Sequence, residues 1–152
     1  MEAAVINRIG TALIGFIVGV SLVTMSAQTS RTYANPRSAS NPESATQPPF
    51  SGAVIVGNTA YLAGVLGAGD TAEAAATAGL NSIQASLKAA GMTMDDLVKV
   101  EVFCPDVAAN YDGFNKVYRT YFKQEFPARA FIGSGTLING AKFEIQGIAV
   151  KR

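Results

Sequence analysis

The chain has 152 residues, of which 49% are hydrophobic and 15% charged, and its formal net charge is +1. This length suits one domain with enough apolar material for a core, and the balanced charge lacks the basic face that nucleic-acid binding usually needs. Because there is no His and only one Cys, Cys104, the sequence excludes a His- or Cys-based metal site, a disulfide within the chain, and Ser-His-Asp or Cys-His catalysis. Cys104 is predicted to be a small buried hydrophobe.

The N-terminus is predicted to direct the protein out of the cytoplasm. An apolar run, residues 9–25, follows Arg8 and is followed by the small residues Ser26 and Ala27. This order is typical of a secretory signal peptide, here residues 1–27. The run is also just long enough for a retained membrane anchor. A soluble core helix is the remaining alternative, but the run lacks the polar face expected of one. We therefore expect a periplasmic or secreted protein, or one anchored by this segment.

Residues 28–48 form a segment of different composition. Ser, Thr, Asn and Pro dominate it, and such a segment buries too little apolar surface to offset the entropy of ordering. We predict a disordered linker there, followed by a globular domain at residues 49–152.

The first elements of that domain are predicted to be a hairpin and a helix. Residues 50–56 and 59–66 indicate two strands joined by a turn at Gly57-Asn58. Asp70 or Thr71 caps the following helix, and Gly91 ends it. Its apolar positions recur at spacings of four and three, which places them on one helical face: Ala76, Leu80, Ile83, Leu87 and Ala90.

The second half predicts one more helix between strands. Residues 97–104 alternate and indicate a strand, residues 111–122 a helix, and residues 128–135 and 141–150 two final strands. The order β-β-α-β-α-β-β predicts an α+β fold in which both helices cover one face of a mixed sheet.

Two charged residues within the last strands are the candidates for chemistry. Arg129 begins one strand and Glu144 lies inside the other. A guanidinium offers a fork of donors to a carboxylate and keeps its proton, whereas a carboxylate can act on water. The alternative is that both are surface charges, since such residues are mostly exposed.

Several motifs in register resemble the RidA/YjgF reactive-intermediate deaminase family. They comprise Pro127-Ala128-Arg129, Phe143-Glu144-Ile145, the strand at residues 95–103, the helix at residues 114–118, and the hairpin from Val56 to Gly64. The resemblance covers about residues 49–152.

This resemblance implies a chorismate-mutase-like fold, a homotrimer with clefts between subunits, and hydrolysis of enamines and imines such as 2-aminoacrylate to 2-keto acids and ammonia. No cofactor is implied, because the imine carbon is already electrophilic. Arg129 would hold the carboxylate of a small 2-imino or 2-keto acid. Glu144 would position or activate the attacking water. Asn115, Phe50 and Phe131 would contact the substrate.

The chain departs from the family pattern around this site. Phe50 stands where the family usually has Tyr, and Phe131 where it has a small residue; Ala63 and Val65 replace polar residues. We therefore expect a more apolar, narrower pocket that accepts larger or more hydrophobic substrates. A non-catalytic module that binds small carboxylates is the main alternative, and a nuclease is a third, which the neutral charge disfavours.

Overall fold

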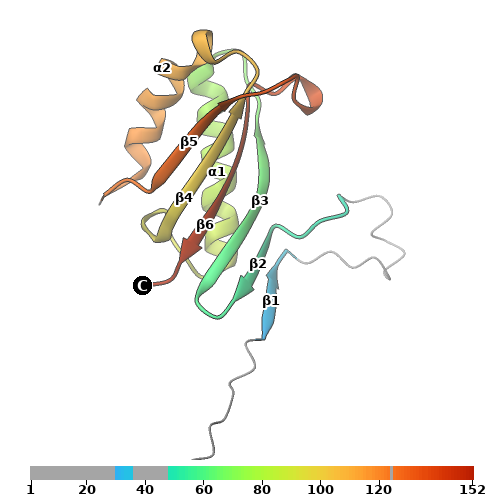
Figure 1. Ribbon diagram of the computed structural model, residues 1–152, viewed down its shortest axis with the longest axis vertical. Helices are drawn as coiled ribbons and strands as arrows, with labels where there is room; N and C mark the ends of the chain where they lie inside the picture. Colours follow the sequence, from blue (N-terminus) through green and yellow to red (C-terminus); the bar gives the residue numbers. More distant parts are fainter. Residues whose placement is uncertain (1–29, 36–47, 124) are drawn as a thin grey trace, which may run out of the picture.

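The computed structural model describes residues 30–35, 48–123 and 125–152 (Figure 1). Within them, one sheet and two helices are formed. The strands are β1 (Arg31–Ala34), β2 (Ala53–Val56), β3 (Thr59–Gly67), β4 (Leu97–Cys104), β5 (Ala128–Gly133) and β6 (Phe143–Val150). The helices are α1 (Ala72–Ala89) and α2 (Val107–Tyr118), with short 3-10 turns at Met94–Asp96, Arg119–Tyr121 and Ile138–Gly140.

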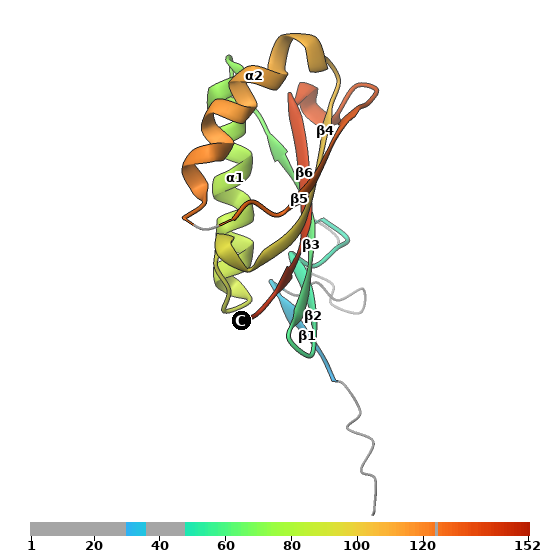
Figure 2. The same cartoon turned by 60° about the vertical axis from the view of Figure 1, so that its left-hand side comes forward.

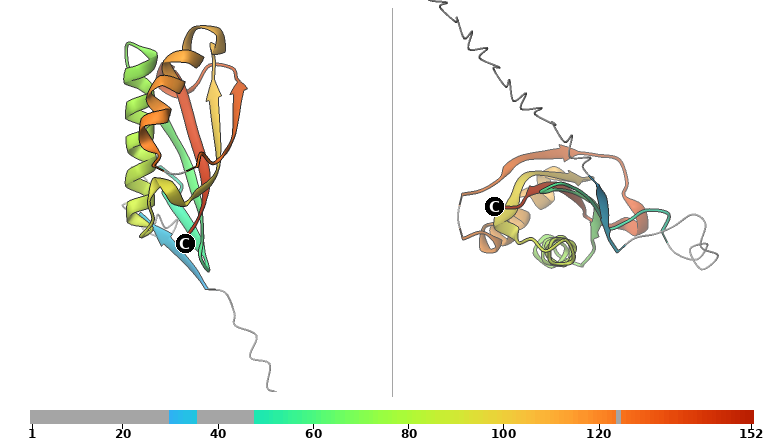
Figure 3. Two further views of the ribbon diagram at one scale, coloured as in Figure 1. Left: turned by 90° about the vertical axis from the view of Figure 1, so that its left-hand side faces the viewer. Right: turned by 90° about the horizontal axis from the view of Figure 1, so that it is seen from below.

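The sheet is mixed, as the sequence predicts. Its strand order is β1-β2-β3-β6-β4-β5, and the neighbouring strands pair antiparallel except β4 and β5, which are parallel. A parallel pair needs a crossover connection, and α2 supplies it. Both helices cover the same face (Figure 2), and the sheet curves around them (Figure 3). The α+β fold with two helices on one face is confirmed.

The core lies between the helices and the covered face of the sheet. Helix α1 contributes Leu80, Ile83 and Leu87, each at most 2% exposed, and β6 contributes Phe143 and Ile145, each at most 1% exposed. The alternation along β6 turns Glu144 and Gln146 to the other face, which we call the open face.

The N-terminal boundary differs from the prediction. Arg31–Ala34 forms β1, which pairs antiparallel with β2, so the linker predicted at residues 28–48 is wrong for this stretch. The pairing depends on backbone hydrogen bonds to β2, and only Ala34 is buried. The composition therefore gave no hydrophobic signal for this strand. Residues 36–47 of the predicted linker lie outside the described residues.

The first turn of α2 also differs from the prediction. The helix begins at Val107, four residues before the predicted start at residue 111, because the side chain of Asp106 accepts a hydrogen bond from Ala109 N at 3.0 Å. An Asp at this N-cap position satisfies a backbone donor that the helix leaves free. For α1 the predicted boundaries hold: Thr71 is its N-cap, and Gly91 follows its end with a φ of 71°.

Among the described residues, no helix is long and apolar enough to cross a membrane. The apolar run at residues 9–25, predicted as a signal peptide or anchor, lies outside them.

Candidate active site

Arg129 lies on the helix-covered side of the sheet. It is the second residue of β5, and its partner across the parallel ladder is Val100, which is 2% exposed and belongs to the core. Cross-strand partners point to the same face, so the Arg129 side chain extends toward α2. It is half-buried there.

One face of α2 holds the Arg129 guanidinium by uncharged contacts. Asn115 Oδ1 accepts a hydrogen bond from Arg129 Nη2 at 2.7 Å. The ring of Tyr118, one turn further along α2, has its centre 4.6 Å from Arg129 Cζ. Three more ring centres lie within 6.0 Å of the same atom: those of Tyr111, Phe114 and Phe131. A cation over the face of an aromatic ring is attracted by the ring quadrupole.

The positive charge of Arg129 has no carboxylate partner in the described part of the chain. The ion pairs found there join Lys99 to Glu101 and Lys116 to Glu73. A guanidinium carries five N–H donors, and Asn115 takes one of them. The remaining donors can therefore serve an anion, and a carboxylate matches their fork geometry.

Tyr118 forms the packed support beneath this guanidinium. The residue is 4% exposed, and its ring contacts those of Phe114, Phe122 and Phe126 at centre distances of 5.5, 4.8 and 6.1 Å. Its hydroxyl is enclosed and has no hydrogen-bond partner in the described structure. Burial raises the pKa of Tyr118 to about 12, which the nearby positive charge of Arg129 only partly offsets. The side chain is therefore neutral at physiological pH.

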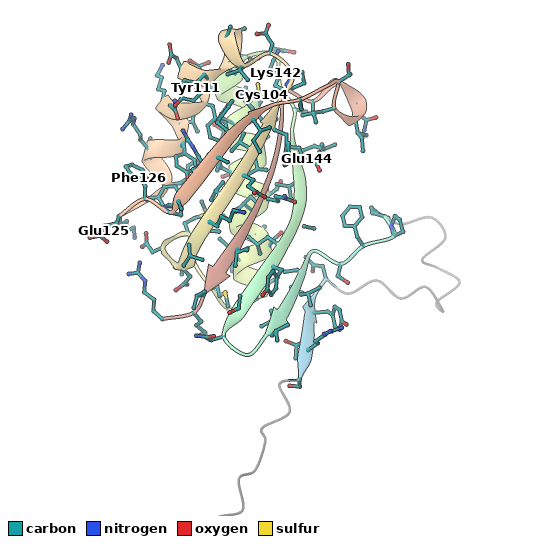
Figure 4. The ribbon with its side chains drawn as sticks, viewed as in Figure 1. Cys104, Tyr111, Glu125, Phe126, Lys142 and Glu144 are labelled. Atoms are coloured by element: carbon teal, nitrogen blue, oxygen red, sulfur yellow. The ribbon has the colours of Figure 1, made fainter. Side chains whose placement is uncertain are left out.

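Glu144 lies on the open face, away from Arg129. It pairs with Phe103 of β4 and with Leu66 of β3, and Figure 4 shows it beside β3 while Tyr111 and Phe126 lie at the α2–β5 side. Strand β3 has a bulge between Leu62 and Val65, and inside it Gly64 leaves room for the Glu144 carboxylate, because a Cβ there would collide with it. Glu144 is half-buried and has no hydrogen-bond or ion-pair partner among the described residues.

A second carboxylate on the open face is already occupied. Glu101 lies 2.7 Å from Lys99 Nζ and accepts a hydrogen bond from Gln146 Nε2 at 2.8 Å. These bonds from Lys99 and Gln146 hold the pKa of Glu101 below its ordinary value. Of the two strand carboxylates on this face, Glu144 is thus the one available for chemistry.

The structure brings together three of the five predicted site residues. Arg129, Asn115 and Phe131 lie side by side at the α2–β5 junction. Glu144 is on the opposite face of the sheet, and Phe50 precedes β2 with 54% of its surface exposed. Phe131 does not simply line a pocket, because its ring packs on Tyr111 at 5.0 Å and Phe114 at 5.3 Å.

A small cavity opens beside Arg129. It has a volume of about 120 Å³ and is lined by Asn115, Tyr118, Arg119, Phe126, Pro127 and Arg129. A larger hollow of about 600 Å³ lies between α1 and the turn at Met94–Asp96, but it contains none of the predicted site residues. We place the site at the smaller cavity, because its wall holds the uncompensated cation.

Sequence reasoning missed three residues of this arrangement. Tyr111 and Tyr118 occupy apolar positions of a helix, where an aromatic residue ordinarily belongs to the core. The sequence pattern therefore did not indicate that their rings contact Arg129. Gly64 interrupts the apolar pattern of β3, and a glycine within a strand does indicate a bulge or a close approach.

This fold and site define a class of protein: a small α+β domain in which an amide and aromatic rings hold an arginine that has no carboxylate partner among the described residues. A sequence model of the family described as "Endoribonuclease L-PSP" matches residues 40–151. The chain belongs to this family, which is also called RidA/YjgF.

Named relatives agree with this assignment. The 2-iminobutanoate/2-iminopropanoate deaminase of Homo sapiens is 35% identical over 112 residues, covering 68% of this chain and 80% of that protein. The protein of the same name from Bos taurus is 38% identical over the same shares. The crystal structure of the YjgF gene product from E. coli is similar at 29% identity with a TM-score of 0.66, covering 71% of this chain and 92% of that one. RidA from an Antarctic Psychrobacter is also 29% identical, with a TM-score of 0.64 and coverage of 81% and 98%.

Proposed function

We propose that the protein hydrolyses small 2-imino acids and their enamine tautomers to 2-keto acids and ammonia. The observation that carries this proposal is the Arg129 guanidinium, which is held by Asn115 and aromatic rings and has no carboxylate partner in the described structure. The names of the human and bovine relatives support the same substrate class.

Arg129 binds the carboxylate of the substrate. Its donors form a planar fork that can take both carboxylate oxygens, and its charge persists at every physiological pH. The neighbouring rings reduce contact with water, which strengthens attraction for an anion. Binding through the carboxylate leaves the C=N carbon exposed at the mouth of the cavity.

Glu144 acts on the attacking water. Its carboxylate accepts one proton as the water oxygen bonds to the imine carbon, and it passes that proton to the nitrogen to give a carbinolamine. It then moves the hydroxyl proton of this intermediate to the nitrogen as the C=O bond forms, the C–N bond breaks and ammonia leaves. Protons and electrons balance without any redox partner. Each step needs only a carboxylate, a water molecule and an electrophilic carbon.

Arg129 and Glu144 meet only if two copies of the chain form the site. Strand β4 lies between their strands, so the strand axes are about 10 Å apart, and the two side chains leave opposite faces of the sheet. Arg129 of one copy and Glu144 of another can share one substrate where the α2–β5 edge approaches a neighbouring open face. The site is therefore incomplete in a single chain.

The open face is suited to contact with such copies. It is rich in apolar side chains around the Glu144 row, and extended apolar surfaces of this kind mark interfaces. By strand pairing they are Val54, Val56, Tyr61, Leu66, Phe103, Ile132 and Ile148. We propose a homotrimer, a closed arrangement in which each copy gives Arg129 to one site and Glu144 to the next.

The proposed setting is outside the cytoplasm. The signal-like residues 1–27 support export, followed by cleavage near Gln28 or retention as an anchor. The catalytic domain would then act on imines in the periplasm or the medium.

A partition assay tests the activity. An amino-acid oxidase generates the imine of alanine or leucine, and semicarbazide traps whatever is not hydrolysed first. We expect the protein to divert imine from the trap to keto acid in proportion to its concentration. If keto acids bind but the partition never changes, the chain is the non-catalytic carboxylate-binding module instead.

A further inference from the structure

The ring of Tyr118 lies nearer to Arg129 Cζ than those of Phe114, Phe131 and Tyr111. Its centre lies 4.6 Å away, against 5.6, 5.7 and 6.0 Å for the other three. Asn115 and Tyr118 are three residues apart on α2, so they share one helical face and both reach the same guanidinium. The hydrogen bond fixes one edge of the group, and the ring fixes its plane.

The Tyr118 ring is itself held in place. It stacks on Phe114 with an angle of 27° between the ring planes, and it lies next to Phe122 and Phe126 on its other sides. A ring that is 4% exposed and bounded by three others has little rotational freedom. It can therefore impose an orientation on a flexible side chain that rests against it.

The hydroxyl is unsuited to direct chemistry. It is enclosed by protein atoms, so a ligand in the cavity does not reach it. It also stays protonated, since burial raises the pKa of Tyr118 to about 12. Any part that Tyr118 plays must therefore come from its ring.

We propose that Tyr118 is a positioning residue that aligns the Arg129 fork with the substrate carboxylate through its ring face and not through its hydroxyl. This inference rests on the proposed function for its ligand, but the alignment exists without ligand and can be measured by itself. Arg129 has no acidic partner in the described structure to orient it. The Tyr118 ring therefore orients the guanidinium, as a carboxylate often does for an arginine that binds a ligand.

The ligand-free test is the rotation of the guanidinium. In full-length protein labelled with nitrogen-15, we expect Arg129 to give resolved Nη signals because rotation about its Nε–Cζ bond is hindered. Tyr118→Phe should keep them, and Tyr118→Leu should average them. Averaged signals in the unaltered protein, or unchanged signals in Tyr118→Leu, overturn the proposal whatever the protein's activity is.

The ligand test uses pyruvate and 2-oxobutanoate as probes. Tyr118→Phe should bind them within about twofold of the unaltered protein, whereas Tyr118→Leu should bind about five- to thirty-fold more weakly, the range of a cation–ring contact. The KM for imine should rise with the dissociation constant while kcat changes less, because Glu144 is untouched. In an Arg129→Lys background, Tyr118→Leu should weaken keto-acid binding by less than about twofold, because Tyr118 acts through the guanidinium of Arg129.

Phe122→Leu is the matched control. Phe122 packs on the Tyr118 ring at 4.8 Å, and its ring is not one of the four that lie over Arg129 Cζ. Equal losses of affinity in Phe122→Leu and Tyr118→Leu would show a merely structural role, and an equal loss in Tyr118→Phe would assign the effect to the hydroxyl; either result overturns the proposal.

If Tyr118→Leu does not fold, pentafluorophenylalanine at residue 118 replaces it. That side chain keeps the shape of Phe and reverses the ring quadrupole, so affinity should fall relative to Tyr118→Phe, and undiminished affinity overturns the proposal. If the unaltered protein binds neither keto acid, the proposed function fails while the nitrogen-15 result stands.

Discussion

Arg129 and Glu144 leave opposite faces of the same sheet, on strands separated by β4. The first lies under α2 with Asn115 and Tyr118, and the second lies beside Gly64 in the bulge of β3. Within a single chain the two side chains therefore do not face each other.

Arg129→Lys should weaken binding of pyruvate by about one to two orders of magnitude, the worth of a charge-assisted hydrogen bond. Lysine keeps the charge but loses the planar fork and the bond to Asn115. Isothermal titration at fixed ionic strength measures the effect. Arg119→Lys, at the exposed rim of the same cavity, is the control and should change affinity little. Unaltered affinity in Arg129→Lys would remove Arg129 from the site.

Glu144→Gln should leave keto-acid binding nearly intact and lower turnover by about 10²–10⁴-fold, the usual contribution of a general base. Glu101→Gln is the matched control, because Glu101 lies on the same open face but is held by Lys99 and Gln146. The partition assay, run beside titrations with pyruvate, separates the two effects. Equal activity in the two variants would show that Glu144 has no special part in the reaction.

Co-assembly of the two impaired variants should restore activity. In an equal, random mixture of Arg129→Lys and Glu144→Gln copies, about a quarter of sites take both native residues if each site spans two copies. Selection for both tags removes the unmixed assemblies, and in a trimer it raises the expected fraction to about a third. The activity of co-expressed, doubly tagged protein measures this fraction, and light scattering gives the number of copies. No recovery in verified mixed assemblies would mean that both residues act within one chain, and a monomer at micromolar concentration would rule out the trimer.

Tyr118→Phe should resist alkaline unfolding better than the unaltered protein. Burial raises the pKa of Tyr118 to about 12 in the folded chain, against about 10 for a free phenol. The unfolded chain therefore loses this proton first, so the free energy of unfolding falls as pH rises from about 10 to about 12. Tyr118→Phe has no phenol at this position, so its free energy of unfolding does not fall for this reason. Its melting temperature should therefore rise relative to that of the unaltered protein as the pH increases over this interval.

At neutral pH, Tyr118→Phe should melt at the same temperature or higher, because it removes a buried hydroxyl that has no partner in the described structure. Tyr121→Phe is the contrasting variant, because the Tyr121 hydroxyl donates a hydrogen bond to Asn81 Oδ1 at 2.8 Å and its removal should lower the melting temperature. A large loss of stability in Tyr118→Phe at neutral pH would contradict the assignment of that hydroxyl.

Expression of the full chain with a C-terminal tag should yield protein outside the cytoplasm. Mass spectrometry of the exported fraction should find a mature form beginning near Gln28, or the intact chain in the membrane fraction if residues 9–25 stay as an anchor. Deleting residues 1–27 should leave the tagged domain in the cytosol. Full-length protein found wholly in the cytosol is the result that refutes export.

The elements predicted well are those with strong local signals. The spacing of Leu80, Ile83 and Leu87 specified α1, and the strand predicted at residues 141–150 corresponds to β6. Strand β1 was missed because its stability comes from pairing with β2 and not from its own side chains. A sequence pattern indicates a strand through the spacing of its buried apolar residues. Because only Ala34 of β1 is buried, the pattern did not indicate this edge strand.

The contacts around Arg129 could not be predicted from the sequence. Arg129 and Asn115 were singled out, yet their contact depends on how α2 crosses over β4 and β5. The face that Arg129 takes was also hidden, since its neighbours Ala128 and Ala130 are small and give no alternation. For that reason the sequence did not show that Arg129 and Glu144 point apart.

The parallel pairing of β5 with β4 makes the position of Arg129 sensitive to the length of the preceding loop. Val100 opposes Arg129, and Glu101 opposes Ala130. A slip of β5 by one residue would move every side chain of the strand to the other face of the sheet. Arg129 would then leave Asn115 and Tyr118 and project from the open face beside Lys99 or Glu101, depending on the direction of the slip, and the anion site would be lost. One inserted or deleted residue between Tyr121 and Pro127 could therefore abolish ligand binding in a chain that still folds.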